Sequence, residues 1–284
     1  MEGIDRKKII IAIVLLLVVL ATIFYFQNNK ANNFNSVTYF DVGQGDSALI
    51  KFDNGQKMLV DCGINRNILS KLGSALSFFD RTIDYLVISH PDGDHYGGCP
   101  AVLQRYQVKN IITNGAQKTN DPFWKAWQKY SQLEQAQNKV ISGHEILTIG
   151  ASRIEFLAPD ESLGADFNKA GGNNQSIVFL LKNNLGKYLF TGDMEILLEE
   201  ALIKKYCAGA VYCPALQADF LKVGHHGSDS SSGDLFLQAV NPKFSVISVG
   251  QNSYGHPSLR TLRKLDREGS EIWRTDQKND IIVK

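Results

Sequence analysis

The chain has 284 residues, of which 44% are hydrophobic and 21% are charged, and its formal net charge at pH 7 is +1. A charge so close to zero gives no overall attraction to nucleic acid, so a nuclease with this sequence needs a local basic patch. About 250 residues follow residue 35, enough for one large domain or two small ones. No Pro/Gly/Ser-rich linker and no internal repeat divides them.

The N-terminal segment predicts a membrane anchor. Residues 9–26 form 18 consecutive residues without a charge, near the lower limit for spanning a bilayer and too long for most signal-peptide cores. No small-x-small cleavage site follows, although a cleaved signal peptide is the alternative. Basic residues in the segment 1–8 favour a cytoplasmic tail there, a transmembrane signal-anchor at 9–26 and a linker at 27–35. The domain 36–284 is then extracytoplasmic, in a single-pass protein of the cell membrane.

The first half of the domain shows apolar segments that predict strands and helices in a regular order. The expected elements are strands 37–40, 48–52 and 57–60, a helix 66–79, a strand 83–88, a helix 99–106 and a strand 109–112. Cys62 and Cys99 lie in this half, and Cys207 and Cys213 in the second. An exported domain could pair them, and Cys207 and Cys213 are close enough in sequence for a bridge, with free thiols as the alternative. None has the spacing of a cysteine-type zinc site.

A helix that starts at Asp121-Pro122 carries aromatic and basic side chains, namely Phe123, Trp124, Lys125, Trp127, Lys129 and Tyr130. Such a mixture can hold nucleic acid. An aromatic face packed on the core is the favoured interpretation. His144 has no partner nearby in the sequence and is expected at the surface.

The second half alternates strands and helices as well. The expected elements are strands 154–157, 177–181, 188–190 and 220–223, a helix 196–205, a helix near Leu235, a strand 244–248, a helix 259–268 and closing strands at 273–276 and 281–283.

Histidine and aspartate residues crowd the turn that follows strand 83–88. His90, Asp92, Asp94 and His95 lie within six residues. Imidazole nitrogen and carboxylate oxygen are the usual ligands of Zn²⁺, Mn²⁺ and iron. A solvated polar turn is the alternative, but the same chemistry recurs downstream.

Two later strands end in the same kinds of residue. Asp193 follows strand 188–190, and His225 and His226 follow strand 220–223. Strand ends on one side of a sheet converge, so these side chains can meet the first turn. Five or six ligands with at least three carboxylates suit two metal ions rather than one.

These motifs, in this order, resemble the metallo-β-lactamase superfamily: His-x-Asp-x-Asp-His at 90–95, Thr-Gly-Asp at 191–193 and His-His-Gly-Ser at 225–228. Most of that superfamily has histidine where this chain has Asp92. Together with the segments 40–47, 173–176, 254–258 and 274–276, the pattern is similar to the extracytoplasmic nuclease-like domain of the ComEC family of DNA-uptake proteins. The resemblance implies an α/β fold, a four-layer αββα sandwich over residues 36–284 with the site at one edge of the paired sheets. ComEC proteins carry a multi-helix channel, whereas this chain has one predicted span, so DNA transport is not implied.

The resemblance also implies a ligand set. It assigns His90 and Asp92 to one metal site, Asp94 and His95 to a second site, Asp193 to a bridge between the ions, and His226 to the completion of the second site. The superfamily's third histidine of the first site is absent, and Asn173 or Asn174 lies where it is expected. An amide oxygen or a water could replace it. Ligation rich in oxygen moves the preference from Zn²⁺ toward Mn²⁺ or Mg²⁺, so Zn²⁺ and Mn²⁺ are expected first and Mg²⁺ is an alternative.

Other polar residues are expected around these ligands. Asp61 ends strand 57–60 and is expected to orient a ligand histidine, with an ordinary turn aspartate as the alternative. Asp46 is expected near the pocket, although its glycine-rich turn explains the motif nearly as well. His225 and His256 are candidates for contacting a phosphoryl oxygen or protonating the leaving group. The alternatives are a packed histidine for His225 and a helix cap for His256.

Neighbouring side chains in extended backbone point to opposite faces, so only one of His225 and His226 is expected to be a ligand. The glycine after His226 matches the superfamily's ligand position, which assigns the metal to His226. The expected catalytic residues are therefore Asp94, Asp193, His225 and His256.

The leading functional hypothesis is a membrane-anchored, metal-dependent phosphodiesterase that hydrolyses DNA, using a hydroxide held by two metal ions. Hydrolysis of another phosphodiester, such as a cell-wall or lipid headgroup, is the second hypothesis, and a non-catalytic binding module is the third. The intact ligand set argues against the third. Asp92 alters the first metal site, which argues against β-lactam hydrolysis.

Overall fold

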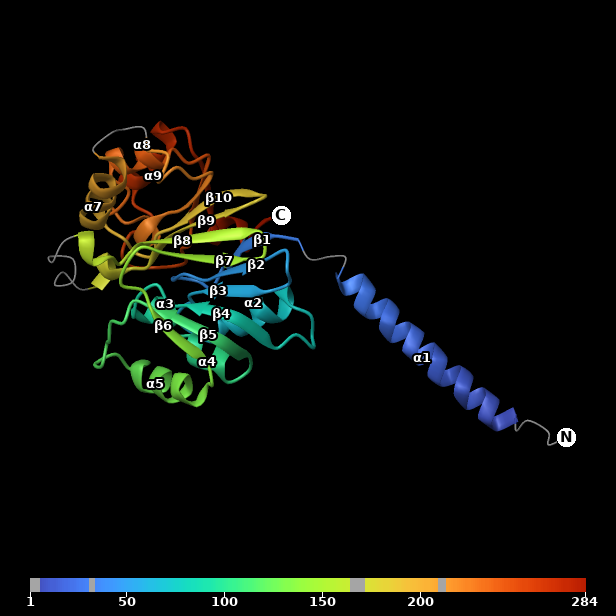
Figure 1. Ribbon diagram of the computed structural model, residues 1–284. Coiled ribbons are helices and arrows are strands. Elements are labelled where there is room, and N and C mark those ends of the chain that lie inside the picture. Colours follow the sequence, from blue (N-terminus) through green and yellow to red (C-terminus); the bar gives the residue numbers. More distant parts are fainter. Residues whose placement is uncertain (1–5, 31–33, 164–171, 209–212) are drawn as a thin grey trace. The chain divides into compact units, whose positions relative to one another are not determined.

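The computed structural model describes residues 6–23, the backbone of 24–30, and residues 34–163, 172–208 and 213–284. The chain divides into two compact units, Met1–Phe34 and Asn35–Lys284. Helix α1 (Arg6–Lys30) belongs to the first unit (Figure 1), and between Ile9 and Ile23 it is mostly apolar, with its large apolar side chains exposed. Among the residues described in full, no helix combines the length and the hydropathy that crossing a membrane requires.

The second unit is built on two seven-stranded sheets. The first sheet has the order β14-β1-β2-β3-β4-β5-β6 and the second the order β13-β12-β11-β10-β9-β8-β7. The strands of the first sheet are β1 (Ser36–Tyr39), β2 (Ala48–Lys51), β3 (Lys57–Val60), β4 (Thr82–Val87), β5 (Gln107–Thr113), β6 (Gln137–Val140) and β14 (Ile281–Val283). The strands of the second sheet are β7 (Glu145–Ile149), β8 (Ser152–Ala158), β9 (Val178–Asn183), β10 (Gly186–Phe190), β11 (Phe220–Lys222), β12 (Phe244–Ile247) and β13 (Glu271–Arg274).

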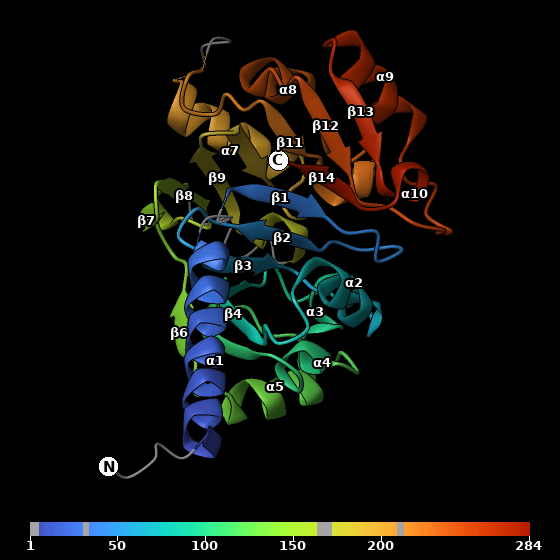
Figure 2. The same ribbon diagram turned by 90° about the vertical axis from the view of Figure 1, so that its right-hand side faces the viewer.

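Helices lie on the outer side of each sheet (Figures 1 and 2). Those beside the first sheet are α2 (Asn67–Ala75), α4 (Cys99–Leu103) and α5 (Trp124–Leu133), and those beside the second are α7 (Ile196–Cys207), α8 (Asp234–Val240) and α9 (Leu259–Arg267). The short elements are α3 (Gly93–Tyr96), α10 (Thr275–Lys278) and the 3₁₀ turns η1 (Glu161–Leu163), η2 (Gly172–Gln175) and η3 (Gly224–Gly227). This layering agrees with the predicted αββα sandwich.

Strand β9 shows why the sequence folds into layers. Its residues alternate between two cores: Phe179 and Leu181 pack between the sheets, and Val178 and Leu180 pack against the helices. A strand buried on both faces reads as a continuous apolar run, which is how this segment appears in the sequence. Full burial of each such side chain contributes about 1.5–3 kcal/mol, so β9 stabilises the packing on both of its faces.

Several predicted boundaries are wrong. Helix α2 ends at Ala75 rather than 79, because Leu76 is extended and the aromatic side chains that follow, Phe78 and Phe79, are exposed rather than on the buried face. The predicted helix 99–106 ends at Leu103, and the predicted strand 273–276 ends at Arg274, because Thr275 begins α10. Strands β6 and β7 were not predicted, because β6 is exposed at every position and the exposed positions of β7 hold both Ile146 and Thr148, so neither strand shows a clear apolar–polar alternation.

Helix α5 supports the core interpretation of its aromatic residues. Trp124 and Trp127 are buried and pack edge-on against Tyr96, with ring centroids 6.0 and 6.4 Å apart. Lys125 and Lys129 are exposed on the other side of the helix. His144 lies at the surface as predicted, where its Nε2 is 2.9 Å from Glu155 Oε1.

Two disulfides cross-link the domain. Cys207 and Cys213 form the bridge that their spacing suggested, and Cys62 and Cys99 form a second bridge between residues 37 positions apart. The second bridge joins the end of β3 to the start of α4. Because Cys62 follows Asp61 directly and its backbone N–H donates to the carbonyl of His95, this bridge fixes the loops that carry the predicted ligands.

Candidate metal centre

The predicted ligands lie on loops that follow β4, β10 and β11. Strand β4 runs parallel to β3, and β10 runs parallel to β11, so their carboxyl ends lie at one edge of each sheet. The turn that contains Gly45 closes over the ligand loop after β4. Gly45 has φ +127°, and a Cβ atom there would lie 2.2 Å from the carbonyl oxygen of Asp94, so only glycine fits.

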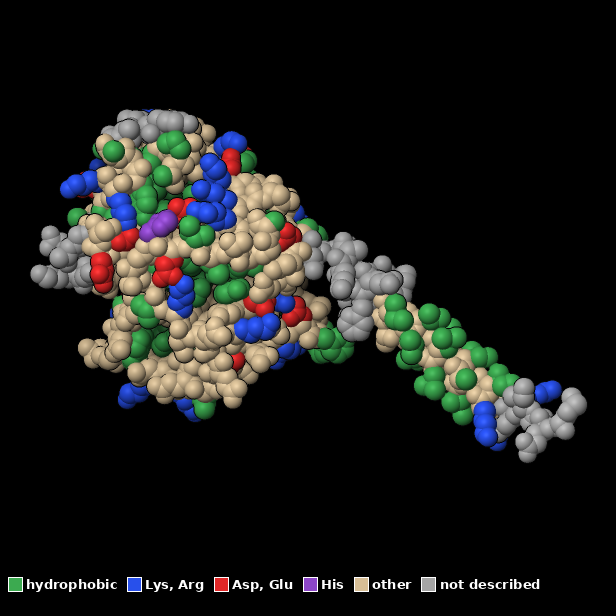
Figure 3. Space-filling model, viewed as in Figure 1, with side chains coloured by type: hydrophobic (Ala, Val, Ile, Leu, Met, Phe, Trp, Pro, Cys, Tyr) green, Lys and Arg blue, Asp and Glu red, His purple; other side chains and the backbone are tan. Residues whose placement is uncertain are grey.

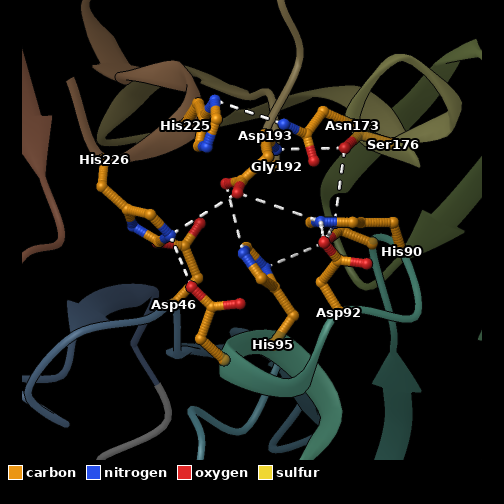
Figure 4. A network of polar contacts seen from close by, with 12 residues as sticks. Asp46, His90, Asp92, His95, Asn173, Ser176, Gly192, Asp193, His225 and His226 are labelled. Atoms are coloured by element: carbon orange, nitrogen blue, oxygen red, sulfur yellow. Dashed lines mark hydrogen bonds and ion pairs between the residues drawn. The ribbon is translucent and has the colours of Figure 1, made fainter. Parts of the chain in front are cut away.

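Three histidines direct the same ring nitrogen at Asp193 (Figure 4). His95 Nε2 lies 3.2 Å from Asp193 Oδ1, His226 Nε2 lies 3.5 Å from Asp193 Oδ2, and His90 Nε2 lies 3.9 Å from Asp193 Oδ2. Asp94 adds a second carboxylate, with Oδ2 3.1 Å from His226 Nε2. The structure therefore brings together ligand candidates from three separate loops around one central carboxylate.

The other nitrogen of each ring is engaged by a neighbouring group. His95 Nδ1 lies 3.0 Å from Asp61 Oδ2, His226 Nδ1 lies 2.8 Å from the carbonyl oxygen of Ser248, and His90 Nδ1 lies 3.1 Å from Ser89 Oγ. A hydrogen bond at Nδ1 fixes the ring orientation and leaves Nε2 for a metal. The site is thus arranged for ligation through Nε2.

Asp61 lies where a residue that orients a ligand histidine is expected. Ser89 donates to it twice, from its backbone N–H at 2.8 Å and from its hydroxyl at 2.7 Å. The side chain is buried and its backbone has φ +56°. These contacts hold the carboxylate against His95 in one geometry.

Asp46 is paired with a lysine that the sequence interpretation missed. Lys222 is buried, and its Nζ lies 2.8 Å from Asp46 Oδ2. Burial alone would raise the pKa of Asp46, but the charge of Lys222 and the hydrogen bond with His226 outweigh it and lower the pKa. The signal in the sequence was a lysine at the end of the apolar strand β11, three residues before the histidine pair begins at His225.

Buried polar atoms at the centre fit a cation. His90 Nε2, His95 Nε2 and Asp193 Oδ1 are buried, and despite the 3.2 Å approach of the last two none of them makes a well-aligned hydrogen bond to a described residue. Ligand atoms of Asp94, His95, Asp193 and His226 all lie within 4.8 Å of one another. Leaving such groups unpaired is costly, whereas nitrogen and carboxylate ligands are what Zn²⁺ and Mn²⁺ accept.

The remaining two ligand candidates lie on the other side of Asp193. His90 Nε2 is 3.8 Å from Asp92 Oδ2, and Lys118 Nζ is 2.6 Å from Asp92 Oδ1. Asp193 thus lies between this pair and the cluster of Asp94, His95 and His226. Such an arrangement suits a carboxylate shared by two ions.

The expectation of extended backbone at His225 and His226 is wrong. Both residues have left-handed backbone, with φ values of 47° and 52°. The two rings nevertheless separate: His226 is buried in the ligand cluster, and His225 is partly exposed. The left-handed turn thus places only one of the two rings within the ligand cluster.

His225 has a carboxylate partner that was also missed. Its Nδ1 lies 3.1 Å from Glu195 Oε1, which also accepts from Ser230 Oγ at 2.8 Å and from Asn173 Nδ2 at 3.2 Å. Figure 4 shows His225 beside Asn173, whose Nδ2 lies 3.2 Å from His225 Nδ1. His256 is the next ring along, with its centroid 5.2 Å from that of His225. The only signal for Glu195 was its position two residues after Asp193.

Asn174 and His256 lie near the site in different ways. Asn174 Oδ1 accepts from the backbone N–H groups of Glu195 and Leu198, both at 3.3 Å. Its amide oxygen is therefore engaged by the N-terminal end of α7. His256 does not cap α9, because Ser258 accepts from Thr261 there. Its Nδ1 is buried and has no hydrogen-bond partner in the described part of the chain, which leaves that ring nitrogen available.

We expect metal binding to release protons. Burial alone would lower the pKa of His226, but the charge of Asp193 and the hydrogen bonds with Asp46 and Asp94 raise it to about 10, and carboxylates raise the pKa of His95 as well. Below pH 10 the metal-free cluster therefore holds protons that a metal must displace. Apparent affinity should rise with pH up to about 10 and fall as the pH is lowered.

Calorimetry in two buffers with different ionisation enthalpies would measure this release at pH 8. His226→Gln should release fewer protons per metal than the parent chain. Metal binding with no proton exchange would show that these rings are neutral before the metal arrives.

Comparison with known proteins agrees with this geometry. Residues 40–251 match the model of the metallo-β-lactamase superfamily. The chain is 28% identical over 265 residues to ComE operon protein 3 of Bacillus subtilis, covering 86% of this chain and 32% of that protein. It is 31% identical over 246 residues to competence protein ComA of Neisseria gonorrhoeae, covering 85% of this chain and 31% of that protein. The chain thus spans about a third of these relatives, which are members of the ComEC family.

Solved structures with the same fold include human tRNase Z, short form. It superposes with a TM-score of 0.51 at 14% sequence identity and covers 88% of this chain and 99% of that chain. At this identity the likeness shows the fold alone.

Proposed function

The chain belongs to the metallo-β-lactamase superfamily, and on this premise we propose that it is a metal-dependent phosphodiesterase that hydrolyses DNA. The observation that carries the proposal is the convergence of three histidine Nε2 atoms on Asp193, next to a histidine held by Glu195. Competence proteins among the relatives support a nucleic-acid substrate. Two divalent ions, Zn²⁺ or Mn²⁺ first and Mg²⁺ as the alternative, would supply activation of water and stabilisation of charge on phosphorus.

We assign the candidate ligands to two metal ions. His90 and Asp92 would hold one ion, and Asp94, His95 and His226 the other, with Asp193 shared between them. Asp94 keeps a deprotonated carboxylate over a wide pH range: burial would raise its pKa, but the hydrogen bond with His226 and the charge of His95 lower it further. It can therefore orient an attacking water as well as bind a metal.

His225 is placed to contact the phosphate or to protonate the leaving oxygen. Among the described residues Glu195 contacts its Nδ1, so Nε2 would carry the proton, and the partly exposed ring lies at the rim of the cluster. His256 lies beside it and would contact a phosphoryl oxygen. This division gives each of the four proposed catalytic residues, Asp94, Asp193, His225 and His256, a distinct position around the cluster.

Hydrolysis assays would test the proposal directly. We expect the metal-loaded chain to cleave single- or double-stranded DNA faster than the generic diester bis(p-nitrophenyl) phosphate, with Mn²⁺, Zn²⁺ and Mg²⁺ compared in parallel. The metal-free chain should be inactive and should recover on metal addition. Cleavage of the generic diester without cleavage of DNA would favour a cell-wall or lipid phosphodiester, and no metal-dependent hydrolysis would favour a binding module.

We also propose that residues 9–26 anchor the chain in the cell membrane with residues 27–284 outside. Basic residues precede this uncharged run, which favours a cytoplasmic N-terminus. The two disulfides, Cys62–Cys99 and Cys207–Cys213, support an oxidising location for the domain.

Protease added to intact cells should digest the domain while a cytoplasmic control protein survives. Full protection of the domain under those conditions would mean that the topology is reversed.

A further inference from the structure

A pocket lies beside the metal centre, between the carboxyl ends of β4 and β5 and helix α5. Its volume is about 180 Å³, and its walls include Pro91, Tyr96, Asn114, Ala116, Trp124 and Trp127. We propose that this pocket receives one nucleobase of the diester substrate. The inference rests on the proposed function and extends it by naming the group that the enzyme recognises next to the scissile phosphate.

The pocket and the metal centre share one segment of the chain. Pro91 and Tyr96, which line it, are the direct neighbours of the ligand candidates His90 and His95. Asn114 on its rim donates from Nδ2 to the carbonyl oxygen of Gln175 at 2.8 Å. That contact ties the rim to the loop whose next residue, Ser176, accepts from the backbone N–H of Asp193 at 3.0 Å. The segment that carries His90 to His95 thus borders both the pocket and the ligand cluster.

The walls suit a flat heteroaromatic ring. Trp124 and Trp127 are 7% and 8% exposed, and together with Tyr96 they give an aromatic lining. Trp124 Nε1 is buried and has no hydrogen-bond partner in the described ranges, so the lining includes an unused donor. Aromatic walls with a few polar groups at the rim are typical of sites that bind single-stranded bases with little sequence preference.

The size and charge of the surroundings agree with a single base. A volume of 180 Å³ equals the share of roughly six water molecules in the liquid, well below the pockets of drug-sized ligands. Lys118, the residue after the rim residue Gln117, has its Nζ 2.6 Å from Asp92 Oδ1. Acidic, basic and histidine side chains gather on the face viewed in Figure 3. A cation beside an aromatic pocket is the combination that tracks a nucleic-acid backbone.

Filling the pocket from its rim tests the inference without removing core residues. Ala116 is half-buried in a loop, so Ala116→Phe should fold, and Ala151→Phe on the exposed turn between β7 and β8 is the matched control. The two substrates are thymidine 5′-(p-nitrophenyl) phosphate and methyl p-nitrophenyl phosphate, assayed with the full chain in detergent. We expect the parent chain and the control to prefer the nucleoside diester by roughly 10-fold or more in kcat/KM. Ala116→Phe should lose that preference through a higher KM and keep its rate on the methyl diester.

A preference that survives in Ala116→Phe, or that is absent in the parent chain, overturns the inference. If neither diester is hydrolysed by the metal-loaded parent chain, the proposed function fails, and the pocket is then tested by binding alone. Quenching of tryptophan fluorescence by thymidine 5′-monophosphate in the parent chain and its loss in Ala116→Phe would support the pocket. Equal quenching in both chains, or none, would overturn it.

Discussion

Asp193→Ala is expected to reduce hydrolysis to the rate of the metal-free chain and to leave less than one metal per chain. The carboxylate lies within 3.2 to 3.9 Å of the Nε2 atoms of three histidines. Its removal therefore disrupts both groups of ligand candidates at once. The substitution also removes the buried negative charge that the three imidazoles surround in the parent chain. That charge is present because His95 and His226 lower the pKa of Asp193 by more than burial raises it.

Two further variants separate ligation from folding. Asp193→Asn keeps the shape of the side chain and removes its charge, so it should lose metal with a smaller effect on stability. Asp219→Asn is the matched control, because Asp219 lies at the opposite end of β11, where it pairs with Lys243 at 2.8 Å. Metal content by elemental analysis, turnover and the far-ultraviolet circular dichroism spectrum decide the outcome. Turnover near that of the parent chain in a folded Asp193→Ala variant would remove Asp193 from the centre.

His225→Ala and His226→Ala are expected to differ in kind. His226 is buried with its Nε2 3.1 Å from Asp94 Oδ2, so its loss should empty one metal site. His225 is bound by Glu195 outside the ligand cluster, so its loss should leave both metals in place. Turnover should then fall by roughly 10²–10⁴-fold, the range of general acid–base catalysis.

Metal content and kcat measured on both variants distinguish the two roles. Glu195→Gln serves as a companion variant, since it weakens the contact that holds His225 and should lower kcat without changing metal content. Metal loss in His225→Ala with retention in His226→Ala would reverse the assignment.

The ligand chemistry was readable from the sequence because it is local. His90, Asp92, Asp94 and His95 lie in one turn directly after an apolar strand, and Asp193 and His226 also follow strands. Since strand ends meet at a sheet edge, residue type and position relative to a strand were enough to predict that they converge. Apolar runs such as 85–88 likewise predicted buried strands, whereas the αββα layering was implied by the family resemblance.

The supporting contacts depended on which distant segments meet in space. Lys222 pairs with Asp46 across 176 positions of the chain, and His225 pairs with Glu195 across 30. Cys62 and Cys99 are joined because the loop after β3 meets the start of α4, where the backbone N–H of Gly98 donates to the carbonyl of Gly63. Hydrophobic periodicity shows only which residues of one helix or strand share a face. It carries no information about which distant residues that face contacts.

His225 and His226 also show the difference between what the sequence determines and what the tertiary structure decides. The sequence determined that a histidine pair follows β11 and that one ring was the better ligand candidate. Only the tertiary structure decided where each ring lies. The carbonyl of Ser248 accepts from His226 Nδ1, Glu195 contacts Nδ1 of His225, and both residues have left-handed backbone. That conformation costs free energy for a non-glycine residue, so it persists only where surrounding contacts fix it.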